Sequence, residues 1–274
     1  MEAYWDVIKR IVKESDLVLE ILDARLIELS RNEKVEEIIK DAQRPFIFVI
    51  NKSDLARGRG LKKQVDKLRE EGEVVFVSAK DKNSIHVLFT AIKKVFKEHG
   101  KRQQSIKKIG DPKPEFREAK ADIVVGVLGY PNVGKSSLIN ALAHKKKVQV
   151  SKKSGTTHGI HWVKATNEIK LIDSPGVIPL AKDDPVRYGL IGAKDVERLK
   201  NPQLVSDAII QLFLQNNKES FQNFYGITIK DENLEIIMQQ IGNKKGFLIK
   251  GGNIDEHRTA SLIVRDWQEG RIQI

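Results

Sequence analysis

Glycine, lysine and serine stand at a spacing that predicts a phosphate-binding loop. Gly129, Gly134, Lys135 and Ser136 match the pattern G-x-x-x-x-G-K-[S/T]. In such a loop, backbone N–H groups surround phosphates, the lysine contacts the outer phosphates and the serine hydroxyl can bind Mg²⁺. A chance glycine turn is disfavoured because an expected strand precedes the loop and an expected helix follows it. The residues expected to contact phosphates are Asn132, Val133, Gly134, Lys135, Ser136 and Ser137.

The segment "NKSD", residues 51–54, predicts a site that reads a purine base. It follows the apolar run "PFIFVI", at the edge where parallel sheets bind ligands. The Asp54 carboxylate can accept from both the ring N–H and the amino group of guanine, whereas adenine offers no such pair of donors. A polar turn is the alternative for this tetrapeptide. The residues expected to contact the base are Asn51, Lys52, Asp54 and, from the end of the next strand, Ser78, Ala79 and Lys80.

The segment "DSPG", residues 173–176, matches the pattern D-x-x-G. Asp173 would hold Mg²⁺ through water, and the Gly176 N–H would contact the γ-phosphate. Between the phosphate loop and this segment lies "SGTTHGI", where Thr156 or Thr157 would close on Mg²⁺ in the triphosphate state. The alternative for that stretch is a polar surface loop.

Apolar periodicity predicts that strands and helices alternate in the first two thirds of the chain, which favours a parallel sheet with helices on both faces. Strands are expected at 16–24, 45–50, 73–80 and 122–129, and helices at 1–13, 31–44, 61–72, 84–100 and 134–143. Residues 159–176 predict a hairpin whose second strand delivers Asp173. Gly100 is the expected C-cap of its helix.

A second domain is expected beyond the sheet. Residues 101–120 are basic, contain two prolines and show no clear period, so we interpret them as a linker within a first domain, 1–178. From about residue 180 the pattern turns helical, and the charges balance at thirteen of each sign. This predicts a helical C-terminal domain, 179–274, with "LVSDAIIQLFL" in its core. Trp267 and Arg265 suit either RNA contact or ordinary packing.

The order of the motifs indicates a circular permutation. GTPases usually place the phosphate loop first, whereas here the base reader comes first and "DSPG" last. Because domain termini usually lie at the surface, a sheet tolerates such a cut, and residues 101–120 would join the old ends. The expected fold class is therefore α/β: a circularly permuted P-loop GTPase domain, followed by a mostly helical domain. Movement at Gly176 could then reorient that second domain.

Charge and composition limit the function classes. The net charge of +11 concentrates in residues 91–120 and 144–164, each with a surplus of six positive charges. Such stretches favour a polyanionic partner, most plausibly nucleic acid, or else form a solvated lysine-rich surface, and charge alone leaves both open. The sequence has no cysteine and no apolar run of about 20 residues, so no disulfide, thiolate metal site or membrane span is expected. We expect a cytoplasmic monomer.

These motifs together resemble those of the circularly permuted GTPases of the YlqF/YawG (RbgA-like) group. The resemblance rests on "LDAR", "SRN", "NKSD", "SAK", "GYPNVGKSSLIN" and "DSPGV" in this order, and on the ending "KGGNIDEHRTASLIVRDWQEGRI". It implies GTP hydrolysis, with the large ribosomal subunit and its rRNA as partners. Ile27 departs from a proline common in relatives. No Pro-Gly-His-Met segment precedes Trp5, so the start is more similar to an archaeal version.

The resemblance also implies roles for single residues. Thr157 rather than Thr156 would bind Mg²⁺ together with Ser136 and Asp173. The implied catalytic residues are Lys135, Thr157, Gly176 and Asn132, of which Asn132 would also help to coordinate K⁺. Val177 stands where Ras-like enzymes hold a water-orienting glutamine. His158 or His161 could position water, or could contact RNA instead. Because Val177 cannot orient water, slow turnover that a ribosomal partner stimulates is expected.

Two other functions stay open. The chain could be an RNA-binding scaffold in which GTP is a structural ligand and hydrolysis is incidental. It could also be a GTPase that acts on tRNA or in signalling, which its C-terminal ending disfavours.

Overall fold

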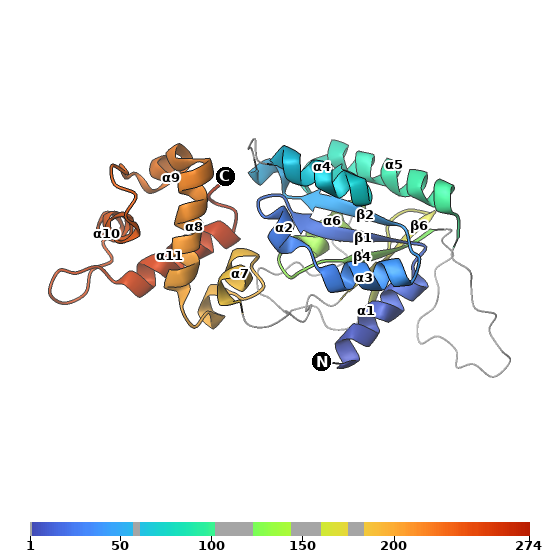
Figure 1. Cartoon of the computed structure of the whole chain (residues 1–274), viewed down its shortest axis with the longest axis horizontal. Helices are drawn as coiled ribbons and strands as arrows, with labels where there is room; N and C mark the ends of the chain where they lie inside the picture. The colour runs from blue at the N-terminus through green and yellow to red at the C-terminus, as the bar shows by residue number, and fades with distance from the viewer. Residues whose placement is uncertain (1, 57–60, 102–122, 144–159, 175–183) are drawn as a thin grey trace.

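The computed structural model describes residues 2–56, 61–101, 123–143, 160–174 and 184–274, and its centre is a six-stranded sheet (Figure 1). The strand order is β3-β2-β1-β4-β6-β5. All neighbours pair parallel except β5 and β6, which are antiparallel as the expected hairpin requires. The strands are β1 (Leu17–Asp23), β2 (Phe46–Asn51), β3 (Glu73–Phe76), β4 (Ile123–Leu128), β5 (His161–Lys164) and β6 (Ile169–Asp173).

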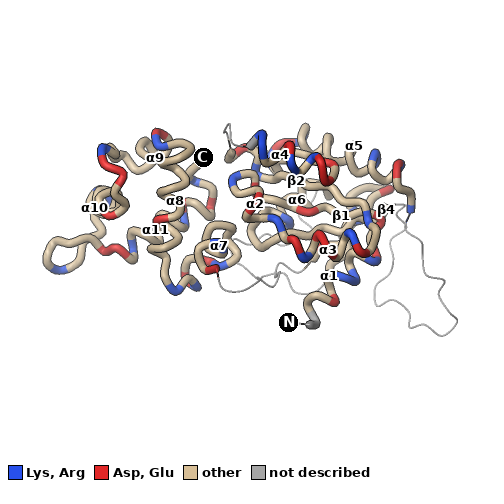
Figure 2. Tube along the Cα trace, in the orientation of Figure 1, with Lys and Arg blue, Asp and Glu red and all other residues tan. Residues whose placement is uncertain are grey.

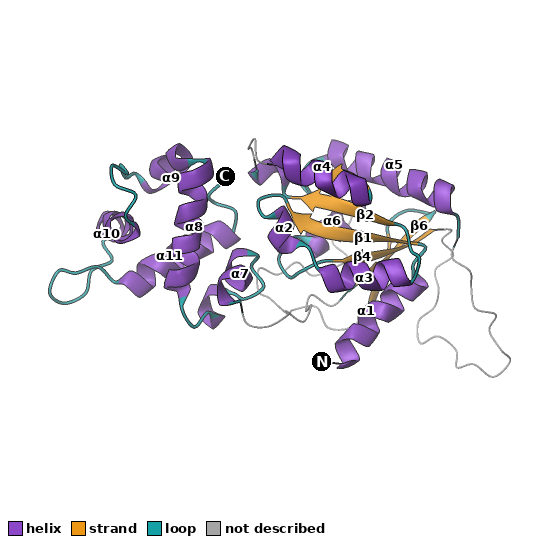
Figure 3. Ribbon diagram, in the orientation of Figure 1, coloured by secondary structure: helices purple, strands orange, loops and turns teal. Residues whose placement is uncertain are grey.

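Helices cover both faces of this sheet (Figure 3). Along β1 and β2, Leu22, Phe48 and Ile50 pack against α4, while the intervening side chains belong to the main core, to which α5 contributes. Buried on both faces, these strands read as continuous apolar runs, as parallel strands do. The helices of this part are α1 (Glu2–Glu14), α2 (Ile27–Ser30), α3 (Glu33–Asp41), η1 (Ser53–Leu55), α4 (Leu61–Glu71), α5 (Lys82–His99) and α6 (Lys135–Leu142).

Caps explain where the helices begin and end. The Asn32 side chain accepts from the N–H of Val35 and so starts α3 two residues later than the apolar pattern suggested. Asp81 accepts from the N–H groups of Asn83 and Ser84, which starts α5 earlier than expected. Gly100 ends α5 with a φ of 74°, as the sequence predicted.

Aromatic side chains pack together among the C-terminal helices, and they belong to the same hydrophobic cluster as the core of the sheet. Phe213 of α8 contacts Phe221 of α9 and Trp267 of α11, with ring centroids 5.0 and 6.1 Å apart. Trp267 is fully buried, so packing rather than RNA contact is its role here. The helices are α7 (Pro185–Leu190), η2 (Val196–Arg198), α8 (Pro202–Asn216), α9 (Lys218–Tyr225), α10 (Leu234–Lys245) and α11 (Glu256–Gln268).

The short helix α7 lies between the C-terminal helices and the sheet (Figure 1). Its Arg187 donates from Nε to the Leu29 carbonyl and from Nη2 to the Arg31 carbonyl, both at 3.0 Å. Basic and acidic residues are interspersed over both parts (Figure 2). Most of the two lysine-rich stretches, and nearly all of the expected linker 101–120, lie outside the described residues. Within the described ranges, no helix combines the length and the hydropathy that crossing a bilayer requires.

Helix α1 crosses β4 at a residue without a side chain. A Cβ at Gly126 would stand 2.6 Å from Ser15 Oγ and 3.2 Å from Ile11 Cγ2. We expect Gly126→Ala to reduce the free energy of unfolding by about 1–3 kcal/mol, because the helix must shift. Urea unfolding measures this. Gly72→Ala is the matched control, since its Cβ would meet nothing nearer than 3.5 Å; equal losses in the two variants would contradict the expectation.

Candidate nucleotide-binding site

The phosphate loop follows β4 at the carboxyl edge of the sheet, and its backbone requires glycine. Gly129 has a φ of 148°, and a Cβ there would lie 2.7 Å from the Ile21 carbonyl oxygen. Gly134 has a φ of 98°, and a Cβ there would collide with the Asn51 side chain. A larger residue at either position would therefore strain the backbone and clash with a neighbouring strand end. Ser136 and Ser137 open α6 and are half-buried.

Lys135 places a buried ammonium inside this loop. Its Nζ donates to the carbonyl oxygens of Gly129 and Tyr130, both at 2.7 Å. Burial lowers the pKa of Lys135 to about 8, a shift that the nearby Asp173 carboxylate opposes. The two carbonyls hold the cation in a loop whose backbone can surround an anion, so the arrangement suits a phosphate group.

Asp173 presents a buried carboxylate at the end of β6. Neither of its oxygens has a hydrogen-bond partner among the residues that the structure describes, and the same holds for Ser174 Oγ. Burial raises the pKa of Asp173 to about 6, although Lys135 and His161 act to lower it. A buried carboxylate that accepts no hydrogen bond within the described ranges, beside the start of α6, fits the expected Mg²⁺ site, because hard divalent cations prefer oxygen ligands.

The base reader is joined directly to the phosphate loop. Asn51 is buried at the end of β2, and its Nδ2 donates to the Val133 carbonyl at 2.8 Å, across 82 residues of sequence. This hydrogen bond brings together the two motifs that the permutation separates along the chain. The close approach of Gly134 to the same side chain completes the contact.

Asp54 is oriented as an exposed acceptor beside the serine-alanine-lysine segment. Its Oδ2 lies 3.2 Å from Lys80 Nζ, and the side chain is 37% exposed. Burial acts to raise the pKa of Asp54, but hydrogen bonds from Ser78 and Lys80 hold it below its ordinary value. The carboxylate is therefore ionised and can accept hydrogen bonds from a base. The Ser78 N–H donates to Ser84 Oγ rather than pointing free to a ligand.

Asn132 of the phosphate loop contacts the C-terminal part of the chain. Its φ of 60° is unusual for a residue with a side chain, and its Nδ2 donates to the Gly192 carbonyl at 2.6 Å. Gly192, which follows α7, thus orients the Asn132 amide, the group that is expected to help coordinate K⁺. Thr157, Gly176 and His158 lie outside the described residues, so their expected roles stay predictions.

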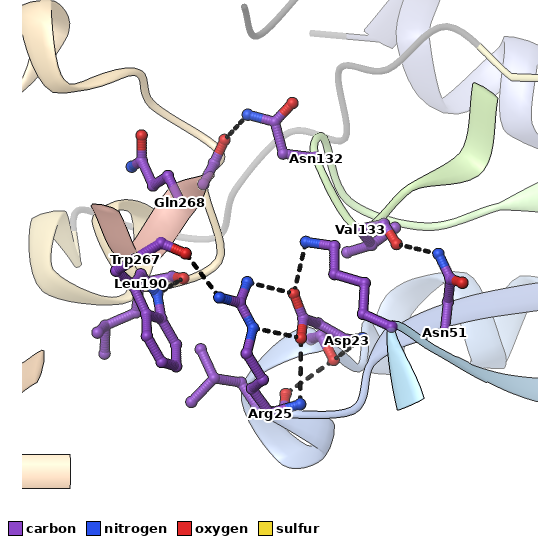
Figure 4. A network of polar contacts seen from close by, with 12 residues as sticks. Asp23, Arg25, Asn51, Asn132, Val133, Leu190, Trp267 and Gln268 are labelled. Atoms are coloured by element: carbon purple, nitrogen blue, oxygen red, sulfur yellow. Dashed lines mark hydrogen bonds and ion pairs between the residues drawn. The ribbon is translucent and has the colours of Figure 1, made fainter. Parts of the chain in front are cut away.

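A buried carboxylate, Asp23, links the base reader to α11 (Figure 4). It ends β1 beside Asn51 and accepts from Lys52 Nζ at 2.8 Å and from Arg25 Nε and Nη2 at 3.0 and 2.9 Å. Burial acts to raise the pKa of Asp23, but the two cations hold it well below its usual range. Arg25 also donates from Nη1 to the Trp267 carbonyl at 2.6 Å.

Comparison with known proteins identifies the family. A family model described as a 50S ribosome-binding GTPase matches residues 124–249. An uncharacterised GTP-binding protein of Methanocaldococcus jannaschii is 35% identical over 97% of this chain, which spans 65% of that protein's length. Ribosome biogenesis GTPase A of Priestia megaterium is 31% identical to this chain, and the match covers 95% of this chain and 88% of the P. megaterium protein. The chain belongs to the ribosome biogenesis GTPase A family.

A solved structure agrees with this assignment at the level of the fold. The crystal structure of GNP-bound YlqF from T. maritima superposes with a TM-score of 0.63, at 21% identity, over 99% of this chain and 95% of that one. The family expected from the motifs and the α/β fold class are therefore confirmed. Family membership identifies the chain as a GTPase.

Three residues at this site of the GTPase have roles that the sequence alone does not predict. In the sequence, Asp23 and Arg25 are only part of "LDAR", and Trp267 suits packing or RNA contact. A signal did exist, because Asp23 ends a strand that neighbours the strand of Asn51, and a polar residue at that edge is a ligand-site candidate. What the sequence could not show is the contact of Arg25 with a residue 242 positions away.

Asp173→Asn is expected to stabilise the protein without nucleotide while abolishing its Mg²⁺-dependent nucleotide binding. The folded-state pKa of about 6 lies above the ordinary 3.8, so the ionised carboxylate opposes folding at pH 7.5. The difference, in which the attraction to Lys135 is already included, corresponds to a gain of at most about 3 kcal/mol.

Denaturant unfolding at pH 7.5 and pH 4.5 measures this effect. Stability from the raised pKa is present at low pH and is lost as pH rises through about 6, so the advantage of the variant should shrink at pH 4.5. An advantage that is equal at both pH values would contradict the assignment.

Proposed function

We propose that this GTPase binds GTP between its phosphate loop and its base reader, hydrolyses it to GDP and phosphate, and acts in assembly of the large ribosomal subunit. The hydrogen bond from Asn51 to the Val133 carbonyl is the observation that carries the binding site. It fixes a base-reading strand end against a phosphate-binding loop, and a nucleotide is the ligand that needs both. The names of the relatives support the ribosomal role.

Each residue at the phosphate end has a stated part in this proposal. Lys135 would contact the outer phosphates with the ammonium that the loop carbonyls already hold. Ser136 and Asp173 would hold Mg²⁺, joined by Thr157, and the ion would neutralise charge on the phosphates. Asn132, oriented by the Gly192 carbonyl, would offer its amide to K⁺.

A residue that positions water remains to be supplied from the loops or from a partner. His161 begins β5 directly opposite Asp173, which places an imidazole at the metal end of the site. His158 and Gly176 would approach from the switch segments. With Val177 in the place of a water-orienting glutamine, we infer slow turnover in the isolated protein.

The helical part beyond residue 178 is proposed as the domain that binds rRNA, and residues 1–178 as the permuted GTPase domain. The contacts of Gly192 with Asn132 and of Arg187 with the segment before α3 support a mechanical link between them. Action as a monomer in the cytoplasm stays a prediction.

Asp54→Asn is expected to exchange guanine for xanthine as the preferred base. An amide can no longer accept from both guanine donors, but its NH₂ can donate to the extra oxygen of xanthine. GDP affinity should fall at least about 100-fold, because donors are left unpaired. Titration with GDP and xanthosine diphosphate measures both affinities. Asp66→Asn on the exposed surface of α4 is the control, and unchanged GDP affinity in Asp54→Asn would exclude this residue as the base reader.

Addition of purified large ribosomal subunits is expected to accelerate GTP turnover in potassium buffer at least about tenfold, because a partner that completes a phosphoryl-transfer site can supply more than this. Small subunits serve as the control. Tight GTP-dependent subunit binding without stimulation would favour the scaffold function instead. In that case Lys135→Ala would reduce RNA affinity and turnover together. Crosslinking to tRNA in place of rRNA would support the tRNA alternative.

A further inference from the structure

We propose that Asp23 and Arg25 are positioning residues for the base reader, and that through Arg25 the affinity for guanine nucleotide depends on docking of α11. The proposal rests on guanine-nucleotide binding at the site described above. Neither Asp23 nor Arg25 is expected to contact the nucleotide itself. Together they hold Lys52, which stands between Asn51 and Asp54 in the base reader.

Lys52 connects two residues with direct roles. Asn51 on one side is bonded to the phosphate loop, and Asp54 on the other is the expected base acceptor. Lys52 itself has a left-handed backbone with a φ of 59°, which costs energy for a residue with a side chain. Its ammonium, 2.8 Å from Asp23 Oδ2, is the anchor that the structure provides for this strained position.

Asp23 can fulfil this role only with a second cation. Its side chain is 1% exposed, so the carboxylate depends on paired donors for its charge. Arg25 supplies two of them from a side chain that is itself 2% exposed. Without Arg25, the carboxylate would be left with Lys52 as its one cationic partner among the contacts described here, in a site closed to water.

The guanidinium of Arg25 also contacts α11. Its Nη1 donates to the Trp267 carbonyl, and its Cζ lies 4.1 Å from the centre of the Trp267 ring. Trp267 is fixed in turn, because its Nε1 donates to the Leu190 carbonyl at 2.7 Å. The position of α11 is therefore transmitted through one planar side chain to Asp23 (Figure 4). Asp23 passes it on to Lys52 through their ion pair.

A second contact leads from the end of α11 to the base reader. Gly270, with a φ of 70°, packs so closely on Leu55 that a Cβ would lie 2.8 Å from Leu55 Cδ1. Leu55 ends η1, the turn that contains Asp54. Coupling between two sites is reciprocal. If bound nucleotide favours the docked position of α11 by a given factor, displacement of α11 therefore lowers nucleotide affinity by the same factor.

Arg25→Lys tests the proposal. Lysine keeps a positive charge near Asp23 but loses the fork of donors and the planar face on Trp267. We expect GDP affinity to fall about tenfold, which corresponds to ~1.4 kcal/mol. GDP affinity is taken from titration with a fluorescent GDP analogue and from the increase in Tm that GDP produces. A purely structural role would lower the Tm without GDP and leave the GDP-dependent increase unchanged.

Arg31→Lys is the matched control. Arg31 is also a largely buried arginine, pairs with Glu36 and Glu71, and lies over the Phe48 ring at 5.2 Å, but none of these partners belongs to the nucleotide motifs. Equal GDP affinities in Arg25→Lys and Arg31→Lys would overturn the proposal. A wild-type protein that binds no GDP would overturn the proposed function, and this inference with it.

Gly270→Ala gives an independent test that leaves the ion pairs intact. The added Cβ would force either Leu55 or the end of α11 to shift, and GDP affinity should again fall. Gly246→Ala is its control, since Gly246 has a similar φ of 66° and a Cβ there meets nothing within 4 Å. The two substitutions share the backbone strain and differ in the contact, so equal GDP affinities in the two variants would also overturn the proposal.

Discussion

Parallel pairing of β1 with both β2 and β4 is the constraint on which the rest of the structure depends. It places the ends of three strands, at Asp23, Asn51 and Gly129, along one edge of the sheet. Residues that are distant in sequence meet there because parallel strands all end on the same side. The order in which the chain visits these strands is therefore immaterial to the site, which is why the permuted chain can build it.

That edge gathers buried charge at a cost in stability. Burial raises the pKa of Asp173 and lowers the pKa of Lys135, so it favours the neutral form of each group. Asp23 is the contrasting case, where two cations more than offset the burial. The difference fits the proposed roles: a carboxylate that no described residue hydrogen-bonds suits a cation ligand, whereas one paired with two cations suits a structural link.

The C-terminal helices contact the nucleotide site at both of its ends. Gly192 bonds to the phosphate loop through Asn132, and Trp267 reaches the base reader through Arg25. Gln268 ties these two contacts together, since its Nε2 donates to the carbonyls of Gly189 and Lys194 at 2.9 and 3.0 Å. The end of α11 and the segment after α7 thus act as one unit, suited to transmit changes at the site to the helical part.

The sequence by itself determined most of the local elements and the spacing of the motifs from which ligand binding is predicted. Continuous apolar runs indicate strands buried on both faces, and the glycines and lysine of the phosphate loop carry their chemistry in their spacing. Only the tertiary structure decided how distant residues combine. Asp23 and Trp267 gain their roles from Arg25, whose contact with Trp267 spans 242 positions. No local pattern records such a contact, because it depends on how the C-terminal helices pack against the edge of the sheet.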